Sequence, residues 1–311
     1  MSSPAVGQLT RRAGMLAFGV AAALASSKFA VAWWTGSISV LASGLDSLLD
    51  MASSGINLFA IITASKPADQ DHRFGHGKAE ALAAFLQSIV ISASGGFILY
   101  QSVKGFWAPP SKMIQDGPAL VVMIASLLMT IVLVRYQARV IAQTDSVAVS
   151  ADKLHYLSDI FGNALVIISL GLTRFTGIGL FDSIGGLFIA AWIIKSSFEI
   201  LQQSLGVLMD RDISDRYRDV LKSVLDDHRP DVIGYHDLRT RTSGYTDHLE
   251  FHLEMPADLS LAESHEIVER IMHVIRERSS TDLDIVIHSD PASINRSGQV
   301  ILEDKAEPRF Y

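Results

Sequence analysis

The 311-residue sequence contains no cysteine, and only 19% of its residues are charged. The absence of cysteine excludes disulfide bonds, thiolate metal ligands and cysteine nucleophiles. The charge content falls below the roughly 25% that is usual for soluble domains. A net charge of -7 also means that the chain lacks the basic surplus expected of a protein that binds nucleic acid. The sequence therefore favours neither a disulfide-rich domain nor a nucleic-acid partner.

The few charged residues are unevenly distributed along the chain. Residues 1–206 hold 11 of the 33 acidic residues, whereas the last third holds the other 22 and seven of the ten histidines. The first two thirds instead contain six apolar stretches, each long enough to cross a bilayer of about 30 Å. These stretches are residues 13–34, 38–64, 81–103, 117–139, 146–172 and 180–205. We predict an all-α, six-helix transmembrane domain over residues 1–208, embedded in the lipid bilayer.

The distribution of basic residues orients the predicted spans. With the N-terminus in the cytoplasm, eight basic residues fall on the inner side, against three on the outer side, or four if Lys28 snorkels outward. Both termini are therefore expected in the cytoplasm. The first span is too long for the apolar core of a signal peptide, so we predict that it is retained.

After Leu208 the hydrophobic pattern becomes that of a soluble domain. Apolar residues recur at helical spacing in two segments and alternate with polar residues in others. The expected helix, strand, strand, helix and strand are residues 213–228, 232–241, 247–255, 261–278 and 282–288. This αββαβ order predicts a small open-faced α+β sandwich over residues 209–291. Residues 292–311 show no periodicity and are predicted to form a flexible tail.

Two of the predicted spans contain ionisable residues that lipid does not tolerate. Asp46 and Asp50 lie in the second span, and His155 and Asp159 lie in the fifth. Each pair is spaced i, i+4, which places both side chains on one helix face. An unpaired carboxylate at mid-membrane costs about 2.5 to 3.5 kcal/mol, and a bound dication would offset that cost. Two such helices facing each other predict a four-ligand metal site within the membrane.

Three carboxylates and one imidazole suit a borderline divalent cation in tetrahedral geometry. Zn²⁺ is expected first, with Fe²⁺, Cd²⁺ and Co²⁺ as alternatives, whereas Mg²⁺ and Ca²⁺ prefer all-oxygen shells of higher coordination number. Because the same groups titrate, protons and metal compete for them. The alternative is that these residues form hydrogen bonds between helices, or a proton wire, without metal.

The predicted function is a secondary transporter that expels a divalent transition metal from the cytoplasm in exchange for protons. One alternative is a membrane metal sensor that signals through the soluble domain. Another is an intramembrane aspartyl protease, which also uses two membrane aspartates. However, the chain contains neither a G-x-G-D motif nor a Tyr-Asp pair.

Two further groups of candidate ligands lie outside the membrane. The loop after the second span contains Asp69, His72 and His76, whose spacings of three and four residues suit a single ion. A solvated loop without metal is the alternative there. In the soluble domain, histidines stand beside carboxylates near strand ends, which also points to metal. The candidates in that domain are His236, His252, His265, His288 and Asp290.

With these residues, the chain resembles the cation diffusion facilitator family, most closely its bacterial zinc and ferrous-iron efflux branch. The resemblance covers about residues 10–291. It rests on the paired D-x-x-x-D and H-x-x-x-D motifs and on the segment PADQDHRFGHGKAEAL. It also rests on HDLRTRTSG, HLEM and IHSDP in the soluble domain.

The resemblance implies a homodimeric metal/proton antiporter of the bacterial cytoplasmic membrane, and not an enzyme. Its cytoplasmic domain would have a metallochaperone-like fold. The resemblance assigns the four membrane residues to the transport site and the three loop residues to a second site. It assigns the five soluble-domain residues to a site at the dimer interface. In this family, a histidine at position 46 would mark the branch that is more strictly selective for zinc. The aspartate at this position resembles instead the branch that accepts zinc, cadmium and iron.

Overall fold

The computed structural model describes residues 3–35, 38–107, 117–176, 180–279 and 281–292. The chain divides into two compact units, which we describe separately. One unit is Val6–Leu208, and the other begins at Met209. The fold class predicted from the sequence is confirmed, since six long helices are followed by a domain of αββαβ order.

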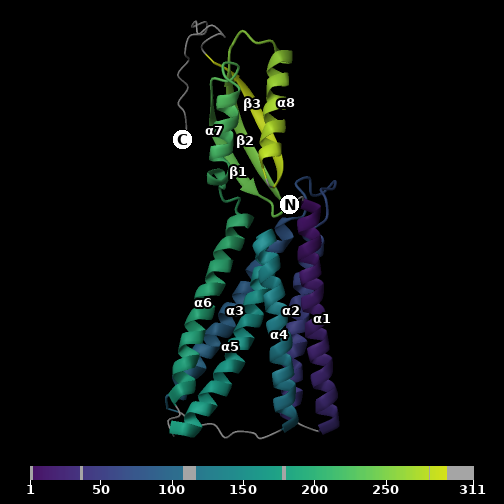
Figure 1. Cartoon of the computed structure of the whole chain (residues 1–311), viewed down its shortest axis with the longest axis vertical. Coiled ribbons are helices and arrows are strands. Elements are labelled where there is room, and N and C mark those ends of the chain that lie inside the picture. Colours follow the sequence, from purple (N-terminus) through teal and green to yellow (C-terminus); the bar gives the residue numbers. More distant parts are fainter. Residues whose placement is uncertain (1–2, 36–37, 108–116, 177–179, 280, 293–311) are drawn as a thin grey trace. The chain divides into compact units, whose positions relative to one another are not determined.

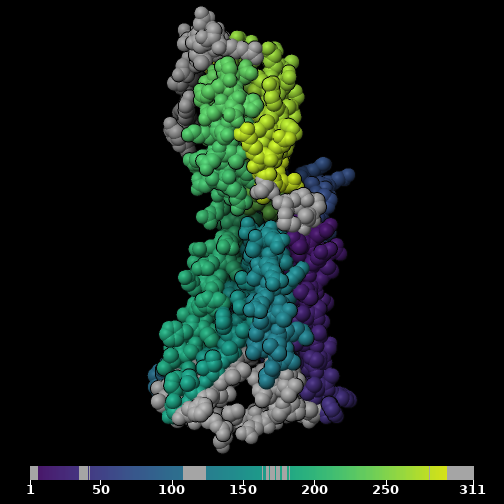
Figure 2. All heavy atoms as spheres, in the orientation of Figure 1, coloured from purple at the N-terminus to yellow at the C-terminus, as the bar shows by residue number. Residues whose placement is uncertain are grey.

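The first unit is a bundle of six long helices that run lengthwise beside one another (Figure 1). The helices are α1 (Ser3–Thr35), α2 (Ile38–Ala64), α3 (Lys78–Gly105), α4 (Gly117–Thr144), α5 (Val147–Thr176) and α6 (Leu180–Leu208). In the space-filling view, residues of α1, α4, α5 and α6 are visible on one face of the bundle (Figure 2).

Five helices in the described part of the chain are long and apolar enough to cross a membrane. They are the segments Val6–Trp34, Ser43–Ala64, Lys78–Gly105, Ile124–Thr144 and Ser183–Leu208. The predicted fifth span forms the long helix α5. Its first half carries the charged residues Asp152, Lys153 and Asp159. This polar half also contains two of the candidate transport ligands.

Small residues let α3 and α6 approach each other closely. A Cβ atom at Gly95 of α3 would lie 2.9 Å from Ile194 Cγ1 and 3.1 Å from Ile193 Cγ2 of α6. Ser92 and Ser197, on the same two helices, share a hydrogen bond of 2.8 Å between their hydroxyl groups. Glycine and serine at a contact between helices are typical of packing within membranes.

A buried polar network joins α2, α4 and α5. Asp152 accepts hydrogen bonds from Ser54 Oγ at 3.2 Å and from Gln137 Nε2 at 2.6 Å. Ser54 Oγ also lies 2.8 Å from Tyr156 Oη. All four side chains are buried. Polar groups inside a bilayer must be satisfied within the protein, so this network holds α2 and α5, the two helices with candidate transport ligands, in a defined register.

The second unit is a three-stranded sheet with two helices packed on one face. Its elements are η1 (Ser214–Arg216), α7 (Arg218–Asp227), β1 (Gly234–Thr242), β2 (Thr246–Met255), α8 (Leu261–Arg278) and β3 (Asp282–Pro291). The strand order is β1-β2-β3, with β1 antiparallel and β3 parallel to the central strand β2. A parallel pair requires a crossover connection, which α8 supplies.

The residues of β2 separate the core of this unit from an open face. Alternate side chains from Leu249 to Met255 are buried against apolar residues of α7 and α8. Successive side chains of a strand point to opposite sides, so the residues between them, including His252, face away from the helices. The metal-ligand candidates on the strands are therefore kept out of the apolar core.

Several predicted limits differ from the structure, and two of the differences in the second unit have a clear structural cause. The helix expected over residues 213–228 is interrupted at Tyr217, between η1 and α7. At this position Tyr217 Oη donates a hydrogen bond of 2.5 Å to Asp247 of β2, which ties the break to the sheet. The strand β3 continues to Pro291, three residues beyond its predicted end. Apart from Ala292, the predicted tail lies outside the described residues.

Candidate metal sites

The membrane unit brings together three of the four predicted transport ligands. Ligand atoms of Asp50, His155 and Asp159 lie within 4.8 Å of one another. His155 Nε2 is 2.9 Å from Asp50 Oδ1 and 4.0 Å from Asp159 Oδ2. All three side chains are half-buried, one on α2 and two on α5. Two carboxylates and an imidazole at this spacing have the chemistry of a transition-metal site.

Asp46 lies one helical turn before Asp50 on α2 and is exposed in the single chain. Its carboxylate does not belong to the group formed by Asp50, His155 and Asp159. It nevertheless interacts electrostatically with Asp159. Its role as the fourth ligand stays a prediction.

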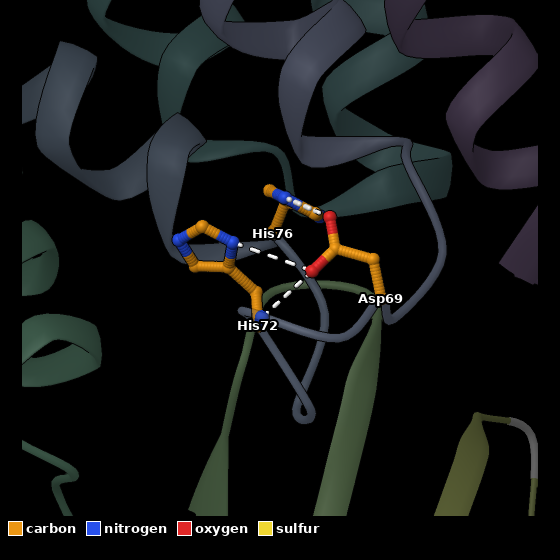
Figure 3. A group of neighbouring side chains, drawn as sticks. All are labelled: Asp69, His72 and His76. Atoms are coloured by element: carbon orange, nitrogen blue, oxygen red, sulfur yellow. Dashed lines mark hydrogen bonds and ion pairs between the residues drawn. The ribbon is translucent and has the colours of Figure 1, made fainter.

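All three predicted loop ligands converge in the segment between α2 and α3 (Figure 3). Asp69 Oδ1 lies 3.5 Å from His72 Nδ1, and Asp69 Oδ2 lies 3.3 Å from His76 Nε2. The backbone N–H of His72 donates a hydrogen bond of 2.7 Å to Asp69 Oδ1. Gly75, with a φ of 80°, adopts the left-handed conformation that glycine accepts readily. The resulting turn lets the two histidines face one carboxylate.

The backbone of this loop also favours the ionised form of Asp69. The hydrogen bond from the His72 N–H, together with one from Asp71, lowers the pKa of Asp69, and the neighbouring histidines act in the same direction. Asp69 and His72 are exposed, whereas His76 is half-buried. A carboxylate that stays ionised beside two imidazoles provides three donors for one divalent ion at the protein surface.

Three histidines stand side by side across the open face of the second unit's sheet. The strand register pairs His236 with His252 and His252 with His288. Asp290 connects them, because its carboxylate oxygens lie 2.9 Å from His252 Nδ1, 3.3 Å from His236 Nε2 and 3.2 Å from His288 Nε2. Imidazoles grouped around a carboxylate are typical zinc ligands. We call these four residues the histidine row.

Glu254 borders the histidine row, although it is not among the ligands predicted from the sequence. Its Oε1 atom lies 3.6 Å from His236 Nε2, and it pairs with Asp290 in the sheet register. Because Glu254 follows His252 by two residues, strand alternation predicts that both lie on this face, but it does not predict a ligand role for Glu254. His265 is exposed on α8 and does not belong to the group of His236, His252 and Asp290. Its role as a ligand stays a prediction.

A bundle of long apolar helices with acid–histidine groups, joined to a small α+β domain, defines a membrane transporter for metal cations. A family model described as "Cation efflux transmembrane domain" matches residues 14–209. A second, ZT_dimer, described as "Cation efflux protein, cytoplasmic domain", matches residues 213–292. The chain belongs to the cation efflux family. It is a multi-pass membrane transporter with a cytoplasmic C-terminal domain, and not an enzyme.

Two cation-efflux pumps of Salmonella agree with this assignment. The cation-efflux pump FieF of Salmonella schwarzengrund and that of Salmonella typhimurium LT2 are each 38% identical to this chain over 288 residues. The alignments cover 93% of this chain and 95% of each pump. Among solved structures, the metal-bound C-terminal domain of the CzcD transporter from Thermotoga maritima is 26% identical. The match covers 25% of this chain and 90% of the CzcD domain, with a TM-score of 0.24. The predicted family and the prediction of a divalent-metal exporter are confirmed.

Proposed function

We propose that this protein exports Zn²⁺ from the cytoplasm across a bacterial cytoplasmic membrane in exchange for protons. Residues 1–208 form the transport domain, and residues 209–291 form a metal-binding dimerisation domain of a homodimer. The grouping of Asp50, His155 and Asp159 inside the helix bundle carries this proposal. Both termini lie in the cytoplasm, as the excess of basic residues on that side predicts.

The donor atoms support zinc as the principal cargo. Zn²⁺ accepts imidazole nitrogen and carboxylate oxygen in a four-coordinate shell, which Asp46 would complete. Fe²⁺ and Cd²⁺ are further cargoes, because a shell with mostly oxygen donors discriminates weakly among borderline divalent ions. In the loop, Asp69, His72 and His76 hold a second ion. The histidine row, with His265, holds metal in the cytoplasmic domain.

The contact between His155 and Asp50 supports exchange of metal for protons. The 2.9 Å separation of His155 Nε2 and Asp50 Oδ1 suits a hydrogen bond, in which one proton lies between the two atoms. Such a proton occupies the lone pairs that would otherwise coordinate a metal ion, so binding of one excludes binding of the other. A more acidic exterior then favours release of the metal on that side.

The test uses the purified protein in proteoliposomes that contain a zinc-sensitive dye. An imposed proton gradient should drive zinc movement in the wild type, and Asp50→Ala and Asp159→Ala should each abolish it. Ser92→Ala is the matched control, because it removes a hydrogen bond between α3 and α6 without touching a candidate ligand. If zinc does not move under the gradient, or if the two aspartate variants transport as fast as the wild type, the proposal is wrong. A membrane metal sensor would bind zinc without moving it.

A further inference from the structure

Lys28 of α1 points toward α2 and is not directed away from the bundle. Its Nζ atom donates a hydrogen bond of 2.7 Å to Ser47 Oγ and one of 3.4 Å to the backbone oxygen of Ser43. Ser47 is buried and lies on α2 between Asp46 and Asp50. From the sequence, Lys28 could snorkel to the outer side, but these contacts hold it beside the candidate transport site.

The helices α1 and α2 lie in close contact beside this lysine. A Cβ atom at Gly44 of α2 would already lie 3.6 Å from Lys28 Cβ and 3.5 Å from the ring of Phe29. The half-buried lysine stem therefore runs along α2 at short range. Its ammonium group is fixed in position by neighbouring residues on the helix that carries two of the predicted ligands.

The ammonium group acts on the predicted ligands through its field. Burial of Lys28 disfavours its positive charge, and the carboxylates of Asp50, Asp159 and Asp46 oppose this effect by electrostatic attraction. Its two hydrogen bonds within the described residues go to uncharged oxygen atoms. The positive charge is thus held near the carboxylates without occupying the oxygen atoms that would bind metal.

Formal charges show what this arrangement achieves. Three ionised carboxylates and a divalent ion leave one surplus negative charge, which Lys28 cancels. An uncompensated charge in the membrane interior is costly. Without Lys28, the surplus negative charge would also strengthen the attraction between the carboxylates and the divalent ion, since charges interact more strongly where water is scarce. A site without this lysine would hold its metal more tightly and release it more slowly.

We propose that Lys28 is a fixed counter-charge of the transport site, which weakens metal binding enough for rapid release. This inference rests on the proposed function. Lys28 is a positioning residue in this proposal, because it acts on the ion through the field at the site and does not coordinate it. The alternative role, a hydrogen-bonded staple between α1 and α2, would depend on Ser47 and not on charge.

The test compares Lys28→Gln and Lys28→Met, which remove the charge, with Lys28→Arg and Ser47→Ala, which keep it. All are made in the full-length protein carrying Asp69→Ala and His252→Ala, so that zinc titration reports mainly on the membrane site. We expect Lys28→Gln and Lys28→Met to bind zinc tighter by about tenfold or more. In proteoliposomes their KM and maximal rate should both fall. Lys28→Arg and Ser47→Ala should stay within about threefold of the parent.

Unchanged zinc affinity in whichever neutral variant folds would overturn the inference. It would also be overturned if Ser47→Ala reproduced the effect of Lys28→Gln, or if Lys28→Arg failed to restore the parent's values. The parent protein separates this inference from the proposed function. If the parent transports zinc and the neutral variants match it, only the counter-charge is wrong. If the parent neither binds nor transports zinc, the proposed function fails, and the counter-charge fails with it.

Discussion

His248 lies outside the histidine row, and burial dominates its behaviour. Its side chain is only 12% exposed, between Asp284 Oδ2 and Ser243 Oγ, each 3.1 Å from a ring nitrogen. Burial, assisted by Arg241, lowers the pKa of His248, although Asp284 opposes the shift. The unfolded chain therefore binds more protons than the folded one as the pH falls below about 6.5. His248 contributes stability that is complete above this pH and is lost as the pH decreases.

We expect His248→Gln to reduce the loss of stability of the cytoplasmic unit between about pH 7.5 and about pH 5.5. Urea unfolding of a fragment of residues 209–292, which contains its own apolar core, measures this change. His273→Gln is the matched control, because that histidine is exposed on α8. Equal pH dependence in the wild type and His248→Gln would contradict the prediction.

Single side chains differ in how far the sequence could place them. The i, i+4 spacing identified Asp50, His155 and Asp159, because helical periodicity fixes which residues share a face and ionisable groups are conspicuous among apolar residues. Lys28 could not be placed in this way, since its direction depends on how α1 packs against α2. Glu254 was missed because its relation to His236 depends on the strand register.

At the scale of whole elements, the contact between α3 and α6 depends on a glycine that has a matched neighbour. Gly95 faces Ile193 and Ile194 of α6, whereas a Cβ at Gly96 would meet nothing within 4 Å. We expect Gly95→Val to destabilise the protein by about 1–3 kcal/mol, because overpacking forces the helices apart. Gly96→Val carries the same helix-propensity change without the clash. Thermal unfolding in detergent should show a lower midpoint for Gly95→Val, and equal midpoints would refute this packing model.

The N-terminus of α8 is closed by a capping box. Ser260 Oγ accepts a hydrogen bond from the Glu263 N–H, and the Glu263 carboxylate accepts one from the Ser260 N–H. We expect Ser260→Ala to cost about 1 kcal/mol of stability in the fragment of residues 209–292, measured by urea unfolding. Ser260→Asp keeps a side-chain acceptor and should retain most of the stability. A loss of similar size in both variants would show that the cap is not the cause.

The existence and order of the elements could be predicted, but not all of their limits. Long apolar stretches and the alternation in β2 carry strong periodic signals. The break at Tyr217 carries no such signal, because it is tied to a hydrogen bond with Asp247, 30 residues away. Likewise, β3 extends to Pro291 because it pairs with β2 as far as Met255. Contacts between distant segments, which one sequence does not display, decide such boundaries.

At the scale of the whole molecule, the acidic residues concentrate in the part that is proposed to dimerise. After residue 206 the chain carries 22 acidic and 13 basic residues, so two copies of this part repel each other near neutral pH. The histidine row lies on the open face of the sheet, away from the helices that cover the core. Divalent ions bound there would cancel part of the negative charge and reduce the repulsion. We therefore expect metal to draw two cytoplasmic domains together.

This expectation is tested with the isolated fragment of residues 209–292 in solution. Zinc should tighten its dimer and make it more compact, because each ion adds two positive charges where two acidic domains meet. X-ray scattering with and without zinc measures the change, and a chelator should reverse it. His252→Ala, which removes the central histidine of the row, should abolish the response, whereas His273→Ala should retain it. Identical scattering profiles with and without zinc would show that the histidine row does not bring the domains together.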